Sequence, residues 1–304
     1  MLRQLAKNLW VVAPPVKPRF PYGNCLYIEG AEPIVIDAGA GVNAFAEIAA
    51  DQVHWVLLSH SHFDHVHSSA CFKQAKVLAG WQEENCYKDE KAYADFNGYS
   101  NWHKLMPGIE RENFTTIFPP PEDVPLAPGF QIIPLAGTFS DMDCWDSGTI
   151  KVRALHLPGH TSGHYGFFIE REGVLFSADL DLVAAGPWLG SNSADIDDLI
   201  CSVERIKQLN PRIIVPSHRR EQDSNLARQL DTFIGVVLKR QEHILNLLKI
   251  PHSIEQLAAY RMVYPHPTTM HEVFWERMTM FNHLRFSLRH GLAAEVCPGL
   301  FQRV

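Results

Sequence analysis

Short apolar runs separated by polar stretches predict buried β-strands over most of the first 220 residues. The predicted strands are Pro33–Ile36, Val53–Ser59, Thr149–Ala154, Val174–Asp179 and Arg212–His218. Between the second and third of them, residues 82–114 carry aromatic side chains at mostly helical spacing. We expect most of these aromatic residues to pack on the core, with a place in a substrate pocket as the alternative.

The apolar spacing becomes helical in the rest of the chain. Apolar residues recur at helical spacing from Leu226 to Leu248, and Pro251 ends that run. Ser253–Gln256 has the pattern of a capping box, which predicts a second, short helix. A third helix is expected over 270–290, and two strands are expected around the turn at Pro298-Gly299. Three helices followed by a hairpin are typical of a winged-helix domain.

Candidate metal ligands follow four of the predicted strands. The run from His60 to His65 holds three histidines and one aspartate directly after a buried strand. His60 and His62 are two residues apart, so in an extended segment they point to the same side. The adjacent Asp64 and His65 diverge and can serve a neighbouring centre. His160, Asp179 and His218 follow three later strands, and imidazole and carboxylate are ligands for zinc and similar ions.

Together these segments resemble the ligand pattern of the metallo-β-lactamase superfamily of hydrolases, over roughly the first 220 residues. The resemblance rests on the HxHxDH run at 60–65, on Pro158-Gly159-His160-Thr161, and on Asp179 and His218 at the ends of strands. It implies an αββα sandwich of two mixed β-sheets, with the active site at one edge. We expect this catalytic domain over residues 1–220 and a helical, winged-helix-like domain over 221–304.

The resemblance also implies a role for each ligand. His60, His62 and His160 would hold one divalent ion, Asp64, His65 and His218 a second, and Asp179 would bridge them. We expect zinc, with iron(II) or manganese(II) as alternatives. Two such ions lower the pKa of a shared water, which then attacks a carbonyl carbon or a phosphorus. Asp64 is the expected catalytic residue, because it would orient the attacking group and shuttle a proton.

Residues beside the ligands are expected to support them. Asp37 ends an apolar strand, and ligating imidazoles usually donate their other N–H to a carboxylate or carbonyl. His164 and Thr161 are expected in the same supporting role. His67 is expected on a helix surface, with a place at the mouth of the site as the alternative. Asp181 is expected as an ordinary polar loop residue, although in an extended chain it would share a side with Asp179. Ala178 stands where the resemblance leads us to expect glycine before the bridging aspartate.

Length and composition agree with an intracellular enzyme. The chain has 304 residues, of which 46% are hydrophobic and 20% charged. Its six cysteines form no CxxC pair, so we expect buried free thiols and a cytoplasmic location. The first residues lack the apolar run of a signal peptide, and no apolar stretch is long enough to span a membrane.

Charge is distributed unevenly between the two parts. Residues 219–304 hold eleven Lys and Arg against eight Asp and Glu, whereas residues 1–218 have a balance of −10. A basic module suggests nucleic acid, but the excess is mild and an acidic catalytic domain repels a phosphate backbone. We therefore expect the C-terminal part to cap the site, close over the substrate or form a dimer contact. The chain could accordingly form a homodimer.

Several functions compete. The leading prediction is hydrolysis of a small ester, thioester or lactone. The tail also resembles that of a β-lactamase-like subgroup with a single-strand-specific endoribonuclease, which gives the second prediction. A persulfide dioxygenase with one iron is a further alternative, because sequence does not fix the metal. A binding protein without turnover is disfavoured because all seven ligands are present, and a true β-lactamase because no export signal is evident.

Overall fold

Two β-sheets packed face to face form the centre of the computed structural model, which describes residues 1–304 except the side chain of Phe114. The first sheet has seven strands in the order β1-β2-β3-β4-β5-β6-β7. They are β1 (Leu2–Ala6), β2 (Leu9–Val12), β3 (Cys25–Ile28), β4 (Ile34–Ile36), β5 (Trp55–Leu58), β6 (Lys76–Gly80) and β7 (Gly137–Phe139). From β4 to β7 the neighbours are parallel, and the others are antiparallel, so the sheet is mixed.

The second sheet has five strands in the order β12-β11-β10-β9-β8. They are β8 (Cys144–Asp146), β9 (Lys151–His156), β10 (Tyr165–Ile169), β11 (Val174–Ala178) and β12 (Ile213–Pro216). β11 and β12 are parallel, and β10 is antiparallel to both β9 and β11. The C-terminal ends of β9, β11 and β12 therefore lie at the same edge. Central strands such as β10 and β11 are buried along their whole length, because both faces of the sheet are covered.

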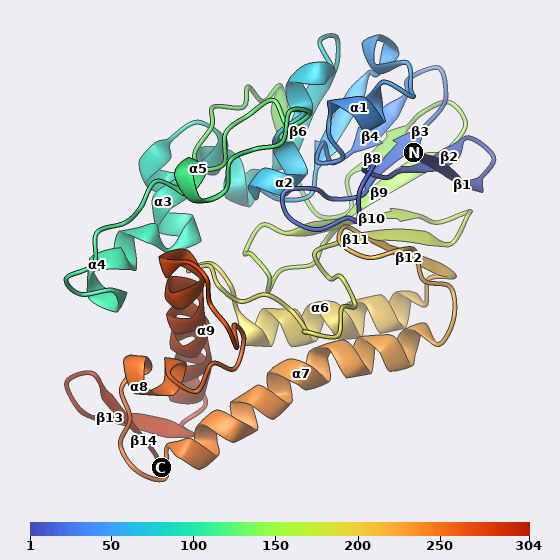
Figure 1. Ribbon diagram of the computed structural model, residues 1–304. Coiled ribbons are helices and arrows are strands. Elements are labelled where there is room, and N and C mark those ends of the chain that lie inside the picture. Colours follow the sequence, from blue (N-terminus) through green and yellow to red (C-terminus); the bar gives the residue numbers. More distant parts are fainter.

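Three hydrophobic clusters give the sandwich its layers. One cluster lies between the sheets, with Leu26 and Leu57 from the first sheet against Phe167 and Phe176 from the second. A second cluster covers the outer face of the first sheet and includes Phe45 of helix α1 (Val42–Phe45). The third joins the second sheet to helices α6 (Ile196–Leu209) and α7 (Leu226–Leu247) (Figure 1). The expected αββα sandwich is therefore confirmed.

The helices of the first part are short, apart from α6. They are α1 (Val42–Phe45), η1 (Ala50–Gln52), α2 (Phe63–Val66), η2 (Ser69–Cys71), η3 (Trp81–Tyr87), α3 (Glu90–Asn97), η4 (Tyr99–Asn101), α4 (Trp102–Leu105), α5 (Phe114–Ile117) and α6 (Ile196–Leu209). Asp195 caps α6 by accepting the backbone N–H groups of Asp197 and Asp198, and Asn210 ends it in a left-handed conformation.

The C-terminal elements have the predicted order. They are α7 (Leu226–Leu247), α8 (Ile254–Ala258), α9 (Met270–Arg289), β13 (Ala293–Cys297) and β14 (Leu300–Arg303). The capping box at Ser253 is present, and Thr269 forms another with Glu272 at the start of α9. The helix-helix-helix-hairpin order is confirmed, whereas the winged-helix assignment and the boundary at residue 220 stay predictions.

The C-terminal segment packs on the sandwich at two places. Phe233 and Val237 of α7 share a hydrophobic cluster with α6. Phe274 and Met278 of α9 form another with Trp102 of α4, and Figure 1 shows α9 beside α4. Residues beyond 250 therefore reach the side of the sandwich from which α3 and α4 project.

Two other expectations concern the surface. Three of the six free cysteines are exposed, namely Cys144, Cys201 and Cys297, so the expectation that all are buried is wrong. These three lie on strand ends and on the outer side of α6, away from the clusters that fill the core. Within the described part of the chain, we find no helix with the length and apolar character needed to cross a bilayer.

Candidate metal centre

All seven predicted ligands meet at one edge of the sandwich. His60, His62, Asp64 and His65 follow β5 of the first sheet, whereas His160, Asp179 and His218 follow β9, β11 and β12 of the second. Their donor atoms form two groups that could each hold a metal ion, with the atoms of a group within 4.8 Å of one another. We call His60, His62 and His160 the first group, and Asp64, His65 and His218 the second group.

Three imidazole nitrogens converge in the first group. His62 Nδ1 lies 3.0 Å from His60 Nε2 and 3.0 Å from His160 Nε2. A neutral imidazole has one donor and one acceptor, so hydrogen bonds cannot satisfy all three nitrogens together. Tetrahedral zinc with Zn–N distances of about 2.0–2.1 Å separates its nitrogen ligands by about 3.3 Å, close to what is seen here. The donor set therefore fits a metal ion.

Asp179 turns one carboxylate oxygen toward each group. Its Oδ2 lies 3.3 Å from His160 Nε2 and 3.9 Å from His60 Nε2. Its Oδ1 lies 2.9 Å from His65 Nε2 and 3.3 Å from His218 Nε2. Asp64 joins the second group, with its Oδ2 3.3 Å from His218 Nε2. This split is the arrangement that a carboxylate bridging two ions requires.

Buried polar atoms without partners also point to cations here. Within the described part of the chain, His65 Nε2 and Asp179 Oδ1 are buried and make no well-aligned hydrogen bond, although they face each other. Buried polar groups are nearly always satisfied, so orphaned ligand-type atoms in a cluster indicate that another species completes them. A divalent ion in each group would do so.

Four of the imidazoles are oriented by their second nitrogen, Nδ1. The acceptors are Ser59 Oγ for His60 (3.0 Å), Asp37 Oδ2 for His65 (2.7 Å), the Trp188 carbonyl for His160 (3.1 Å) and the Tyr22 carbonyl for His218 (3.1 Å). A proton on Nδ1 leaves Nε2 free to ligate, and such contacts fix the tautomer and the ring orientation. In each case Nε2 is the atom that faces the cluster.

Asp37 supports both groups. Besides contacting His65, it accepts hydrogen bonds from the backbone N–H and the hydroxyl of Ser59, both at 2.7 Å. Ser59 in turn contacts His60, so one buried carboxylate orients a ligand of each group. The structure thus places Asp37 where the sequence analysis expected it.

Electrostatics differ between the two groups. Burial lowers the pKa of His62 to about 3, and it also lowers the pKa of His60 and His160. Burial opposes charge on His65 and His218 as well, but Asp179 with Asp37 or Asp181 raises their pKa well above the usual value. Metal binding requires neutral imidazole, so an ion must displace protons in the second group.

Two neighbours differ from expectation. His67 is fully buried, with Nε2 3.1 Å from the Pro21 carbonyl and 3.2 Å from the Gly39 carbonyl, so its predicted surface position is wrong. Asp181 is also buried, and its Oδ1 accepts the backbone N–H of His218 at 2.8 Å. It can join Asp179 and His218 around a cation, so the expectation of an ordinary loop residue is wrong too.

Two further residues lie close behind the ligands. His164 Nδ1 contacts the Leu157 carbonyl at 2.9 Å, and its Nε2 accepts the backbone N–H of Asp179 at 3.2 Å. His164 therefore holds the backbone of the bridging residue. Ala178, which directly precedes Asp179, has a φ of 45°, in the left-handed region. That conformation favours glycine, which explains the expectation of glycine at this position.

The sequence did not predict a role for Glu83. It is buried in η3, where its carboxylate accepts the backbone N–H of Ser61 at 2.6 Å and the hydroxyl of Thr161 at 2.5 Å. Thr161 therefore supports the ligands through Glu83 rather than by direct contact. Glu83 thus connects the loop of His60 and His62 to the loop of His160. Its only sequence signal is an acidic residue shortly after a strand.

A pocket of about 450 Å³ opens over the ligands. Besides ligand side chains and Asp181, it is lined mostly by aromatic residues. The other lining residues are Arg19, Phe20, Phe63, Tyr93, Asn97, Tyr99, Phe118, Gly129, Trp188, Tyr264, Glu272 and Trp275. The aromatic residues of 82–114 therefore have two different places. Tyr93 and Tyr99 line this pocket, whereas Tyr87 and Trp102 are buried in the core.

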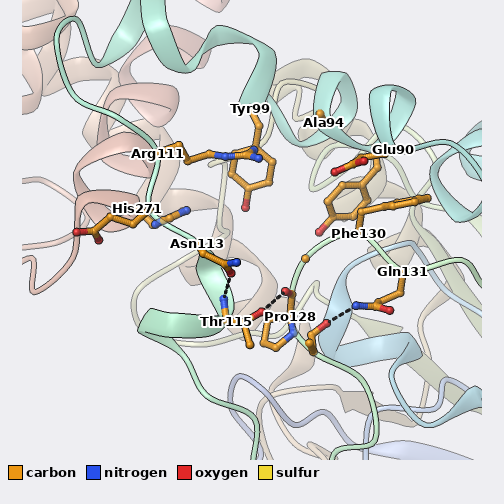
Figure 2. A pocket seen from close by; sticks show the side chains of 14 residues that line it. Glu90, Ala94, Tyr99, Arg111, Asn113, Thr115, Pro128, Phe130, Gln131 and His271 are labelled. Carbon is orange, nitrogen blue, oxygen red and sulfur yellow. Dashed lines mark hydrogen bonds between the residues drawn. The ribbon is translucent and has the colours of Figure 1, made fainter.

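A second hollow of about 440 Å³ adjoins the first and shares Tyr93, Tyr99 and Gly129 with it. Figure 2 shows this hollow, with Arg111 lying over the ring of Tyr99 at 4.9 Å from its centre. Glu90 and Gln131 add polar groups to its lining. The two hollows therefore differ in character, because the one over the ligands is aromatic and its neighbour is more polar.

Comparison with known proteins agrees with this geometry. The family model of the metallo-beta-lactamase superfamily matches residues 18–218. A Beta-lactamase-like protein 2 homolog from Caenorhabditis elegans is 30% identical over 119 residues, which cover 39% of this chain and 38% of that protein. The match thus spans well under two thirds of that relative's length.

Solved structures share the fold over nearly the whole chain. A metallo-beta-lactamase family protein from Thermus thermophilus has a TM-score of 0.78 at 21% identity, covering 99% of this chain and 100% of that one. A Beta-lactamase domain protein from Burkholderia ambifaria has a TM-score of 0.75 at 16% identity, covering 100% and 93%. Because the family model matches residues 18–218 of the 304, the chain belongs to the metallo-beta-lactamase superfamily.

Proposed function

We propose that this protein hydrolyses a small ester, thioester or lactone with two divalent metal ions, most simply zinc. The observation that carries the proposal is the split of the Asp179 carboxylate between two ligand groups. Two ions a few ångströms apart lower the pKa of a water and polarise a carbonyl oxygen. The chain supplies the rest, namely donor atoms, orientation and a pocket.

Asp64 has the chemistry of the catalytic residue. Burial raises its pKa, but contact with His218 and the charge of His65 outweigh this effect and lower the pKa to about 2. Asp64 is therefore ionised at neutral pH before a metal binds, and as a carboxylate it could accept a hydrogen bond from an attacking water. Its place in the pocket lining would let it take the proton of that water as the water oxygen attacks the carbonyl carbon, and give this proton to the leaving group as the bond to that group breaks.

The charges of the C-terminal segment and of the pocket favour a small substrate over nucleic acid. Part of the positive charge of the C-terminal segment is engaged within the molecule, because Arg289 pairs with Asp195 and Asp197, and Arg277 pairs with Glu255. Among the described residues that line the pocket, Arg19 is the sole Lys or Arg. Nuclease sites need cations along the phosphate backbone, and this pocket offers one.

A cytoplasmic location is part of the proposal. All six cysteines are free, and three of them are exposed. Exposed unpaired thiols persist in a reducing compartment, which supports the cytoplasm.

A substrate panel tests the function. Purified protein, stripped with chelator and reloaded separately with Zn²⁺, Mn²⁺ or Fe²⁺, is assayed on thioesters, lactones, phosphodiesters, single-stranded RNA and a persulfide. We expect hydrolysis of a thioester or lactone that chelator abolishes and that Asp64→Ala lowers at least about a hundredfold. Equal rates for the variant and the parent would sink the proposal. Turnover of RNA or persulfide alone would replace it with one of the alternative functions.

A further inference from the structure

The side of the pocket formed by Tyr99, Trp188, Tyr264 and Trp275 comes from three distant parts of the chain. We call these four residues the aromatic wall. Tyr99 follows α3, Trp188 follows the bridging Asp179 in sequence, and Tyr264 and Trp275 belong to the C-terminal segment. Trp188 and Trp275 pack edge to face with ring centroids 5.9 Å apart. The C-terminal segment thus completes the pocket over the metal ligands.

The polar atoms of the aromatic wall are engaged within the protein. Trp188 Nε1 donates to the Tyr264 hydroxyl at 2.8 Å, and Trp275 is hydrogen-bonded to the hydroxyl of Tyr99. The Trp188 carbonyl accepts from His160, which fixes the wall relative to the first group. With these groups satisfied, the wall offers the pocket mainly the faces and edges of its rings.

The loop that carries Tyr264 is held firmly. Glu276 of α9 is fully buried and accepts the backbone N–H groups of Met262, Val263 and Tyr264 at 2.8–3.2 Å. A carboxylate with several backbone donors is a strong, charge-assisted anchor. The wall is therefore built in advance of any ligand rather than formed by a free loop.

Charged groups contribute little to this part of the lining. Glu272 lines the pocket, but its Oε2 accepts from the backbone and hydroxyl of Thr268 and from the backbone of Thr269. Arg19 is exposed. A charged substituent placed against the aromatic wall would lose its water without gaining a partner, which is costly.

We propose that the aromatic wall binds the acyl part of the substrate, and that this part is an uncharged, apolar chain or ring. The inference rests on the proposed hydrolase function and names the class of acyl group. Trp275 is a specificity-determining residue, because it contacts the acyl group without contacting the reacting atoms.

The test measures binding of product-like carboxylates to the zinc-loaded full chain by calorimetry. Acetate, butyrate, hexanoate and octanoate share one metal-binding head and differ in apolar length. Burial of each methylene is expected to lower the Kd about fourfold until the pocket is full. Glutarate is expected to bind at least about tenfold more weakly than valerate, because its second carboxylate meets the rings.

Variants assign the effect to the wall. Trp275→Ala is expected to flatten the dependence on chain length and to leave acetate within about twofold, whereas Trp275→Leu gives an intermediate slope. Trp81→Ala is the matched control, because Trp81 is 58% exposed and lies outside the pocket. A Kd that does not change with chain length would overturn the proposal. Preference for glutarate that disappears in Arg19→Ala would overturn it as well.

Turnover of the same acyl chains, presented as thioesters of one common thiol, distinguishes a failure of this inference from a failure of the proposed function. If kcat/KM follows the carboxylate affinities, both hold. If the carboxylates bind by chain length but no thioester or lactone is hydrolysed, the acyl site stands and the hydrolase proposal fails. If acyl length changes neither binding nor turnover of hydrolysed thioesters, the hydrolase stands and the acyl site fails.

Discussion

The two ligand groups use similar residues in opposite electrostatic settings. The first group consists of imidazoles whose pKa burial lowers. In the second group, Asp37, Asp179 and Asp181 raise the pKa of the histidines well above the usual value. The comparison shows that the number of carboxylates around a histidine, more than its burial, decides whether it holds a proton before a metal arrives.

This difference suggests a division of labour. An ion held mainly by neutral imidazoles keeps more of its positive charge and is better placed to polarise a carbonyl oxygen. An ion held with Asp64 and Asp179 is more fully neutralised and lies beside the expected proton carrier.

The bridge should have the largest effect. Asp179→Ala removes a carboxylate whose two oxygens face the two groups, so we expect metal content to fall from two ions to one or none. Activity should fall at least about a thousandfold, because paired ions act together. Metal analysis and kcat/KM measure the result, with the exposed Asp223→Ala as control. Retention of two ions by Asp179→Ala would show that the carboxylate does not bridge.

Asp37→Asn should weaken the second group more than the first. The carboxylate contacts His65 directly but reaches His60 only through Ser59. Loss of such a partner typically costs about 10–100-fold in metal affinity. Competition with a chromogenic chelator would measure both affinities, and the exposed Asp51→Asn is the matched control. An equal loss in both groups would mean that the contact through Ser59 matters as much as the direct one.

Acid should release the second ion first. His65 and His218 have raised pKa values, so near neutral pH they carry protons that a metal must displace. Affinity in the second group should therefore fall as pH falls, by about tenfold per unit for each proton displaced. The first group, with lowered pKa values, should be nearly insensitive between pH 8 and 6. Calorimetry in buffers of different ionisation enthalpy counts the protons. Equal proton release from both sites would refute the electrostatic contrast.

Glu83→Ala should have the smallest effect on metal affinity of these changes, and it should act mainly on the first group. The carboxylate connects Ser61 with Thr161 but contacts no ligand side chain. We expect metal affinity in the first group to fall about fivefold to tenfold, less than for a direct partner. The neighbouring Glu84→Ala is the control, since Glu84 pairs with Lys88 at the surface. If the two variants retain metal equally, Glu83 does not position the loops.

Much of the site was predictable because its parts are local in sequence. His60, His160, Asp179 and His218 each follow an apolar strand, and the sheets bring strand ends together at one edge. The C-terminal helices were predictable for a similar reason, since a capping box and helical spacing are read within a few residues. The predicted run from 226 to 248 corresponds to α7 within one residue.

The remaining features depend on contacts between distant segments. His67 is buried because the backbone near Pro21 and Gly39 closes over it, and neither segment is near it in sequence. The aromatic wall joins residues 99, 188, 264 and 275, and nothing local relates Trp188 to Tyr264. Burial of Asp181 likewise follows from how β12 lies beside β11. Such features need the assembled sheets and helices before they can be recognised.

The number of metal ions per chain tests the central claim most directly. The protein is purified without chelator, incubated with Zn²⁺ and separated from unbound zinc. Its zinc content is then measured by inductively coupled plasma mass spectrometry. Two ions bridged by Asp179 predict about two zinc ions per chain, both lost on stripping with chelator. One zinc ion or fewer per chain, at zinc concentrations that saturate binding, would contradict a dinuclear centre.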